Sequence, residues 1–207
     1  LALSVAHVDT HAAAIRDARV LLTQHEVAPE ATRHAHLLAR AAAALVIHNP
    51  APPVDGVAEA PLAGIDILTP NETEFAHLLR AHALHDVPAA TIAGLEDALL
   101  HRLCRDLGVA TVVLTLGSEG VFISEAHGYS RMAAEPVPVR DTTGAGDCFN
   151  GALAAALAAG QPLLDAVARA NRVAAMKVGR VGAALAMPTA AEVDRNYPAY
   201  ATAHGKV

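Results

Sequence analysis

Short runs rich in β-branched residues alternate with longer alanine-rich stretches along almost the whole chain. The short runs are typical of buried strands and the long ones of helices. The expected strands are residues 20–24, 45–48, 65–68, 111–116, 121–124 and 129–133. The expected helices are residues 8–15, 29–43, 72–81, 94–107, 146–159, 162–178 and 189–196. This alternation predicts an α/β fold with a mostly parallel sheet and helices on both faces.

One part of the pattern departs from this alternation. The expected strands 121–124 and 129–133 are separated only by a short turn that contains His127 and Gly128. Strands joined so closely pair antiparallel, so a hairpin is expected here. The chain has 207 residues, of which 53% are hydrophobic, and it shows no repeat or low-complexity linker. We therefore expect residues 1–207 to form one domain of ordinary size, or the larger part of one.

Composition excludes several classes of partner. The formal net charge of −6 argues against a nucleic-acid-binding face, which needs an excess of lysine and arginine. No apolar run reaches the ~18–20 residues of a membrane span, and nothing resembles a signal peptide. Cys104 and Cys148 are expected to be reduced thiols in a cytoplasmic protein, and Cys148 a small buried residue. Among the twelve histidines, the pairs His34/His36 and His82/His85 are expected to be solvated helix residues rather than metal ligands.

The segment Asp141-Thr142-Thr143-Gly144-Ala145-Gly146-Asp147 leads directly into an expected helix. A glycine-rich turn that opens a helix directs several backbone N–H groups at one spot, which favours phosphate oxygens. A carboxylate there would repel an anion, but it is suited to take a proton from a hydroxyl group that attacks a phosphoryl group. The segment therefore indicates phosphoryl transfer to an alcohol, and the alternative for Asp147 is that it only caps the helix.

Polar or glycine residues follow four expected strands, at the edge of the sheet where ligands of open α/β proteins bind. These residues are 24–26, 49, 69–74 and 115–120. Asn71 and Glu74 are spaced either to cap the next helix or to face phosphate oxygens, with Glu74 acting through Mg²⁺. Gly117 and Gly120 form an ordinary turn or let a nucleotide approach the backbone. The sequence contains neither a P-loop nor a dinucleotide-binding glycine pattern.

Together these segments resemble the ribokinase-like, or PfkB, carbohydrate kinases. Residues 141–151 are similar to the second signature of that family, and residues 69–74 to its Asn-x-x-Glu motif. Residues 113–120 resemble its nucleotide-loop strand, and residues 21–26 a Leu-x-Gln-Leu-Glu segment of the family. Four motifs in the same order make the resemblance specific, and it covers essentially all 207 residues.

The resemblance implies a three-layer α/β/α core and transfer of the ATP γ-phosphate to a sugar hydroxymethyl group. It implies that Asp147 is the base, with an anion hole formed by the amides of Gly144, Ala145 and Gly146. The residues implied near the nucleotide are Asn71, Thr115, Gly117, Gly120 and Asn171. Glu26 would reach the sugar, and Glu74 would act on Mg²⁺ through water. The residues implied to hold a monovalent cation, K⁺, are Asp141, Thr143, Lys177, Arg180 and Gly182.

The sequence departs from the family pattern in three places. The family's first strand with its sugar-binding aspartate, its Gly-Gly segment and its β-sheet lid have no counterpart in these residues, which match the C-terminal portion of a kinase domain. Ala186 stands where a serine usually helps to bind the cation, and Lys177 stands where a small residue is common. We therefore expect these 207 residues to bind MgATP weakly and ribose barely, with negligible turnover, and K⁺ activation to be weak.

The substrate and the activity have alternatives. Gln24, His25 and Glu26 favour ribose, whereas fructose, 2-keto-3-deoxygluconate or a nucleoside are other acceptors within the same family. A non-catalytic nucleotide-binding remnant is the alternative outside the kinases, and the presence of Asp147 and Glu74 argues against it. Members of the family often dimerise through the lid, so a homodimer is expected only where the lid is present.

Overall fold

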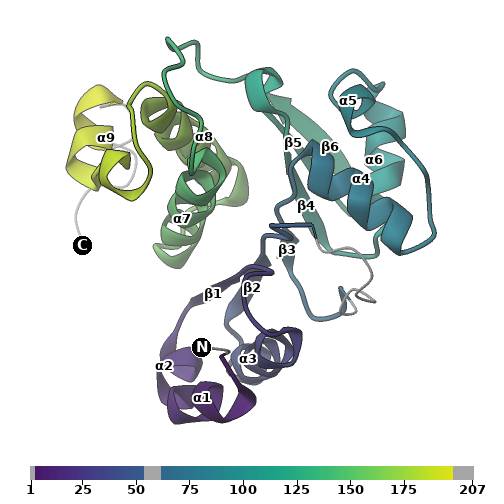
Figure 1. Cartoon of the computed structure of the whole chain (residues 1–207), viewed down its shortest axis with the longest axis vertical. Coiled ribbons are helices and arrows are strands. Elements are labelled where there is room, and N and C mark those ends of the chain that lie inside the picture. The colour runs from purple at the N-terminus through teal and green to yellow at the C-terminus, as the bar shows by residue number, and fades with distance from the viewer. Residues whose placement is uncertain (1–2, 54–61, 198–207) are drawn as a thin grey trace. The chain divides into compact units, whose positions relative to one another are not determined.

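The computed structural model describes residues 3–53 and 62–197 (Figure 1). These residues fall into two compact units, Leu1–Ala133 and Ala134–Val207, and each unit is described by itself. The first unit contains the sheet and helices α1 to α6, and the second contains α7 to α9. Within the described ranges, no helix is both long enough and apolar enough to cross a membrane.

The strands of the first unit form one six-stranded sheet in the order β1-β2-β3-β4-β5-β6. They are β1 (Val20–Thr23), β2 (Leu45–His48), β3 (Ile67–Leu68), β4 (Thr111–Thr115), β5 (Val121–Glu125) and β6 (Gly128–Met132). β1 to β4 are parallel, whereas β5 pairs antiparallel with both β4 and β6. The α/β class, the mostly parallel sheet and the hairpin are thus confirmed. The hairpin turn lies one residue earlier than expected, because Glu125 already pairs with Gly128.

The helices of the first unit are α1 (Val5–Thr10), α2 (Ala12–Asp17), α3 (Pro29–Ala41), α4 (Glu72–Ala81), α5 (Ala89–Ile92) and α6 (Asp97–Asp106). α3 packs near Leu21 and Val46, and α4 to α6 pack against Leu68 and Val112. Leu21 of β1 pairs with Val46 of β2. His48, two residues further along β2, pairs with Leu68 of β3, and Leu68 pairs in turn with Val112 of β4. Side chains two residues apart on a strand share a face. α3 and α4 to α6 therefore cover the same face of the sheet, as right-handed crossovers require.

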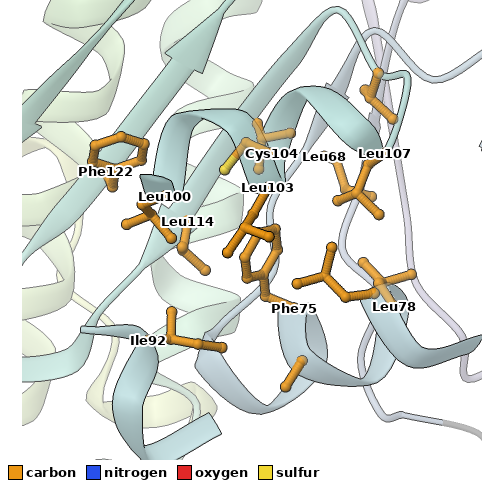
Figure 2. Packing of buried hydrophobic residues seen from close by; sticks show 14 of the residues in the cluster. Leu68, Phe75, Leu78, Ile92, Leu100, Leu103, Cys104, Leu107, Leu114 and Phe122 are labelled. Carbon is orange, nitrogen blue, oxygen red and sulfur yellow. The ribbon is translucent and has the colours of Figure 1, made fainter. Parts of the chain in front are cut away.

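The main apolar cluster of the first unit lies between the sheet and helices α4 to α6 (Figure 2). Phe75 of α4 and Leu103 of α6 pack there with Leu68, Leu114 and Phe122 from the strands. Truncation of a buried leucine in such a core costs about 2–5 kcal/mol. This packing fixes α4, and with it the polar residues at the start of that helix.

The second unit consists of α7 (Ala145–Ala158), α8 (Leu163–Val178) and α9 (Ala190–Asn196) with the short 3-10 helix η2 (Ala184–Ala186). Cys148 of α7, Val173 of α8 and Val193 of α9 form its apolar cluster. Alanines such as Ala156 and Ala170 are buried, and their small side chains suit close helix packing. The cluster holds the start of α7 and the end of α8 in defined positions.

Two expected helices differ from the structure by a break or by more than two residues at one end. The prediction of a single helix over residues 8–15 is wrong, because α1 ends at Thr10 and α2 begins at Ala12. The Thr10 hydroxyl donates to the carbonyl oxygen of His7 at 2.7 Å, and the His11 ring contacts the same oxygen at 3.0 Å. These side chains compete with the backbone N–H that would continue the helix. The expected helix 94–107 begins only at Asp97, after the turn at Gly94.

Candidate active site

The carboxyl ends of β1 to β4 lie at one edge of the sheet in the first unit, because these strands are parallel. The loops that leave this edge are hydrogen-bonded to one another. The His25 N–H donates to the carbonyl oxygen of Ala51 at 2.9 Å, and the Thr115 N–H donates to that of Pro70 at 2.9 Å. The polar residues expected at this edge are therefore neighbours in the structure.

Asn71 and Glu74 form a capping box at the start of α4. Asn71 Oδ1 accepts from the Glu74 N–H at 2.9 Å, and Glu74 Oε2 accepts from the Asn71 N–H at 2.9 Å. Asn71 Nδ2 also donates to Glu74 Oε1 at 2.8 Å. The contacts thus show the capping role, and Glu74 is only 6% exposed. Carboxylate oxygens are ligands suited to Mg²⁺ and its waters, so Glu74 remains the candidate for a water-mediated contact with that ion.

Asn49 is a residue of this edge that the sequence did not assign to the site. It directly follows β2 and is 6% exposed. Its Nδ2 donates to the carbonyl oxygen of Thr69 at 2.8 Å and to Glu74 Oε2 at 3.3 Å, and its Oδ1 accepts from Gln24 Nε2 at 3.2 Å. Asn49 therefore ties the end of β1 to the carboxylate of Glu74. Its place after a buried strand was the only signal in the sequence.

The loop between β4 and β5 contains Thr115, Gly117 and Gly120, with the 3-10 helix η1 (Gly117–Glu119). Gly117 and Gly120 have φ values of +51° and +88°, which side chains disfavour. The Leu116 N–H donates to the carbonyl oxygen of Gly120 at 2.8 Å, which closes the loop. Asn71 also forms a parallel bridge with Thr115. The Asn-x-x-Glu motif and the glycine turn therefore lie side by side.

The residues after β1 are oriented in different ways. Gln24 points toward Asn49, as its hydrogen bond shows, whereas Glu26 is exposed and accessible to a ligand. Two histidines near this edge are buried, so the expectation of a solvated His36 is wrong. Thr23 Oγ1 lies 2.8 Å from His36 Nε2 and 2.9 Å from His48 Nδ1. Burial lowers the pKa of both imidazoles, that of His48 to about 3.

The start of α7 in the second unit has an open anion-binding geometry. Gly144 is the N-cap residue with φ +73°, and Asp147 in the first turn is exposed. The Ala145 N–H donates to the carbonyl oxygen of Thr142 at 3.1 Å, whereas the N–H groups of Gly144 and Gly146 have no acceptor among the residues that the structure describes. A Cβ atom at position 146 would meet no protein atom within 4 Å. Packing among the described residues therefore does not require glycine there.

Asp141 joins the segment before α7 to the loop after α8. Its Oδ1 accepts from the Thr143 N–H at 2.9 Å, and its Oδ2 accepts from the Gly182 N–H at 2.8 Å. These backbone donors, Gly182 first, hold the pKa of Asp141 well below its usual range, and the Lys177 charge adds a smaller effect. Lys177 Nζ donates to the main-chain oxygen of Asp141 at 2.9 Å. Four of the expected cation-site residues thus lie together.

The other expected residues of this unit have different surroundings. The Arg180 guanidinium donates to Glu192 Oε1 at 2.8 Å. The backbone N–H of Arg180 donates to the carbonyl oxygen of Lys177 at 2.9 Å. Hydrogen bonds to the Glu192 carboxylate lower its pKa to about 2; the bond from the Thr189 N–H has the largest effect and the bond from the Arg180 guanidinium the next largest. Asn171 lies six residues before Lys177 on α8 and is half-buried. Ala186 is buried, and its side chain has no oxygen.

Both cysteines are buried, as expected for Cys148. The Cys148 thiol donates to the carbonyl oxygen of Val173 at 3.8 Å, and burial raises its pKa. Burial also raises the pKa of Cys104, to about 12. Because a thiolate is the nucleophilic form of cysteine, neither residue is suited to attack a substrate.

Comparison with known proteins gives a consistent result. A family described as pfkB family carbohydrate kinase matches residues 2–190. A ribokinase of Schizosaccharomyces pombe is 36% identical over 185 residues, which are 88% of this chain and 56% of that protein. A ribokinase of Haemophilus influenzae is 34% identical over 180 residues, which are 87% of this chain and 56% of that protein. The chain therefore spans just over half the length of these relatives.

A solved structure extends this likeness to the fold. The structure of Arabidopsis thaliana ribokinase complexed with ribose and ATP matches with a TM-score of 0.75 and 29% sequence identity. The match covers 90% of this chain and 58% of that one. The fold is that of the ribokinases, and the family match includes both the Asn71–Glu74 motif and the start of α7. The chain belongs to the pfkB family of carbohydrate kinases.

Proposed function

We propose that the protein, as a sugar kinase, transfers the γ-phosphate of ATP to the hydroxymethyl group of ribose, giving ribose 5-phosphate and ADP. The observation that carries the proposal is the exposed carboxylate of Asp147 beside the open amides of Gly144 and Gly146. A group that binds anions and a group that accepts protons are both needed to bring a hydroxyl oxygen to a phosphoryl group. Membership of the family supports this reaction class.

Asp147 is proposed as the general base. It takes the hydroxyl proton while the sugar oxygen bonds to the γ-phosphorus and the bond between that phosphorus and the bridging oxygen of ADP breaks. The N–H groups of Gly144 and Gly146 stabilise the charge on the transferred group. The Ala145 N–H joins them only when its hydrogen bond to Thr142 opens. General-base catalysis of this kind contributes roughly 10²–10⁴-fold to the rate.

The nucleotide is proposed to contact Asn71, Thr115, Gly117, Gly120 and Asn171. In support, the first four of these residues lie side by side in the first unit. Mg²⁺ bound through water to Glu74 would neutralise phosphate charge.

Ribose is the proposed acceptor, with Glu26 binding its hydroxyl groups. The support is that the exposed Glu26 carboxylate follows β1 and that relatives from fission yeast and Haemophilus influenzae are named ribokinases. The Arabidopsis relative is described as complexed with ribose and ATP. Fructose, 2-keto-3-deoxygluconate and nucleosides are the competing acceptors to test.

The test is a coupled assay of ADP release with each of these acceptors, made on the 207 residues and on the same chain with any residues encoded upstream of Leu1. Ribose should give the highest sugar-dependent rate. For the chain as given we expect weak MgATP binding, barely detectable ribose binding by calorimetry and negligible turnover. In the form that turns over, Asp147→Asn should lower kcat by roughly 10²–10⁴-fold with ATP binding retained.

The matched control is Asp165→Asn, because Asp165 stands in the first turn of α8 as Asp147 does in α7. The control should keep its turnover. Near-normal turnover in Asp147→Asn would refute the role of the base. A higher rate with another acceptor would refute ribose alone, and ATP binding without release of ADP under any condition would favour a nucleotide-binding remnant.

A further inference from the structure

A lysine is fully buried in the second unit. Lys177 stands in the last turn of α8 and is 0% exposed, which places it among the largest fully buried side chains of the described residues. A buried ammonium group is costly unless oxygen atoms replace the water it loses. Its Nζ donates to the main-chain oxygen of Asp141 at 2.9 Å. The positive charge is therefore placed at the segment that precedes the glycine turn.

Asp141, whose main-chain oxygen accepts from this ammonium, also contributes a carboxylate that interacts electrostatically with Lys177. Its carboxylate is held by the N–H groups of Thr143 and Gly182, at 2.9 and 2.8 Å. Its pKa lies well below the usual range, chiefly because of these two donors, and Lys177 adds an electrostatic contribution. Asp141 is thus a fixed anion with a cationic side chain beside it. Together they connect residues 141–143 to residues 177–182, next to Gly144.

The monovalent cation that the family resemblance implies does not fit this group of residues. The Asp141 carbonyl already accepts from the Lys177 ammonium, and the Lys177 carbonyl accepts from the Arg180 N–H at 2.9 Å. Position 186, where a side-chain oxygen is expected, is a buried alanine. A K⁺ ion here would also lie close to the like charge of the Lys177 ammonium, which is unfavourable.

We propose that the Lys177 ammonium is a built-in replacement for the monovalent cation, so that this protein does not depend on K⁺. The ammonium supplies the positive charge that holds Asp141 and the loop after α8 together, and this fixes the geometry of the turn at Gly144. Because the charge is covalently attached, no ion has to be bound from solution. Of the measurements that test this proposal, only the effect of K⁺ on turnover rests on the proposed kinase function.

The primary experiment measures thermal unfolding of the 207-residue chain in KCl, NaCl and tetramethylammonium chloride at equal ionic strength. Tetramethylammonium is too large to enter an ion site, so a specific K⁺ effect appears as a difference between the first and third salts. Ligands that bind the folded state raise Tm, and 1 kcal/mol corresponds to about 2–4 °C for a domain of this size. We expect the Tm of the unchanged chain to agree within about 1 °C in the three salts.

Two variants test the role of the ammonium. Lys177→Ala leaves space beside Asp141, so its Tm should fall in tetramethylammonium chloride and recover in part with KCl or with ethylammonium chloride. Lys177→Met keeps the aliphatic volume without the charge, so its Tm should fall with little recovery. Arg169→Met, which removes another cation of α8 that pairs with Asp194 at 3.0 Å, should show no K⁺-specific recovery.

The unchanged chain alone is enough to decide against the proposal. A Tm several degrees higher in KCl than in tetramethylammonium chloride would place K⁺ beside Lys177 and overturn it, even if no variant folds. A Lys177→Met variant as stable as the unchanged chain would overturn it as well. These measurements contain no nucleotide or sugar, so failure of the proposed kinase function leaves them unaffected. Where turnover is observed, replacing K⁺ by tetramethylammonium should change it less than twofold.

Discussion

At the scale of single residues, Asn49 is the side chain that connects the candidate site of the first unit. It donates to the Thr69 carbonyl oxygen and to Glu74, and it accepts from Gln24. Buried polar groups that lose a partner keep the cost of desolvation. The geometry of Glu74, and with it the capping box of α4, therefore depends on a residue outside the motif.

Asn49→Ala is expected to lower the free energy of unfolding by about 1–3 kcal/mol, because the Thr69 carbonyl oxygen and Glu74 Oε2 each lose a donor. Urea denaturation followed by circular dichroism measures the change. Gln24→Ala is the matched control, since it removes the 3.2 Å bond to Asn49 but leaves the Asn49 donors to Thr69 and Glu74 in place, so it should cost less. Equal effects of the two variants would contradict this assignment.

His48 makes stability depend on pH. Burial, with smaller contributions from His25 and His36, holds its pKa to about 3 in the folded protein, against 6.5 for the ordinary side chain. Between these pH values the unfolded chain binds more protons, so stability falls as the pH falls. The slope should be on the order of 1 kcal/mol per pH unit at most.

The measurement is urea denaturation at a series of pH values from 7 to 4. His48→Asn, whose amide can still reach Thr23, should flatten the slope in this window, whereas a change at the exposed His127 should not. A slope unchanged by His48→Asn would show that other groups cause the acid sensitivity.

At the scale of elements, the two glycines at the start of α7 differ in role. Gly144 is needed for the backbone conformation, whereas we propose that Gly146 is needed for a ligand. Gly144 needs its left-handed backbone with φ +73°, whereas Gly146 has no positive φ and a Cβ atom there meets nothing within 4 Å. Gly144→Ala should therefore destabilise the protein by about 1–2 kcal/mol. Gly146→Ala should leave the free energy of unfolding within about 0.5 kcal/mol of the unchanged chain. Thermal and urea unfolding of the two variants check this, and a large loss for Gly146→Ala would mean that packing requires that glycine.

Elements with strong local signals could be predicted from the sequence. α4 begins and ends where expected, because Asn71 and Glu74 cap it and apolar residues recur on one face. The β5–β6 hairpin was also predictable. The break at His11 was not, because it arises from side chains that compete for the His7 carbonyl oxygen.

The site was less predictable where it depends on distant contacts. Lys177 in the last turn of a helix is typical of an exposed cation near the helix dipole, and only the fold places Asp141 against it. His36 and His48 meet at Thr23, from positions 13 and 25 residues away along the chain. No pattern within one segment indicates such contacts.

At the scale of the whole molecule, we propose that the chain binds MgATP with the phosphates at the start of α7. The most direct measurement is calorimetric titration of a non-hydrolysable ATP analogue, in Mg²⁺ and in EDTA, into the chain and into three variants. Gly146→Ala places a methyl group where the phosphate approaches. Gly151→Ala is the matched control, because it lies on the same helix and its Cβ also meets no atom within 4 Å.

We expect Mg²⁺-dependent binding by the unchanged chain, by Gly151→Ala and by Asp147→Asn, in which the proposed base is lost but the amides of the turn remain. Gly146→Ala should bind at least tenfold more weakly, about 1.4 kcal/mol, while unfolding as the unchanged chain does. Equal binding by Gly146→Ala and Gly151→Ala, or no binding by the unchanged chain, would contradict the proposal.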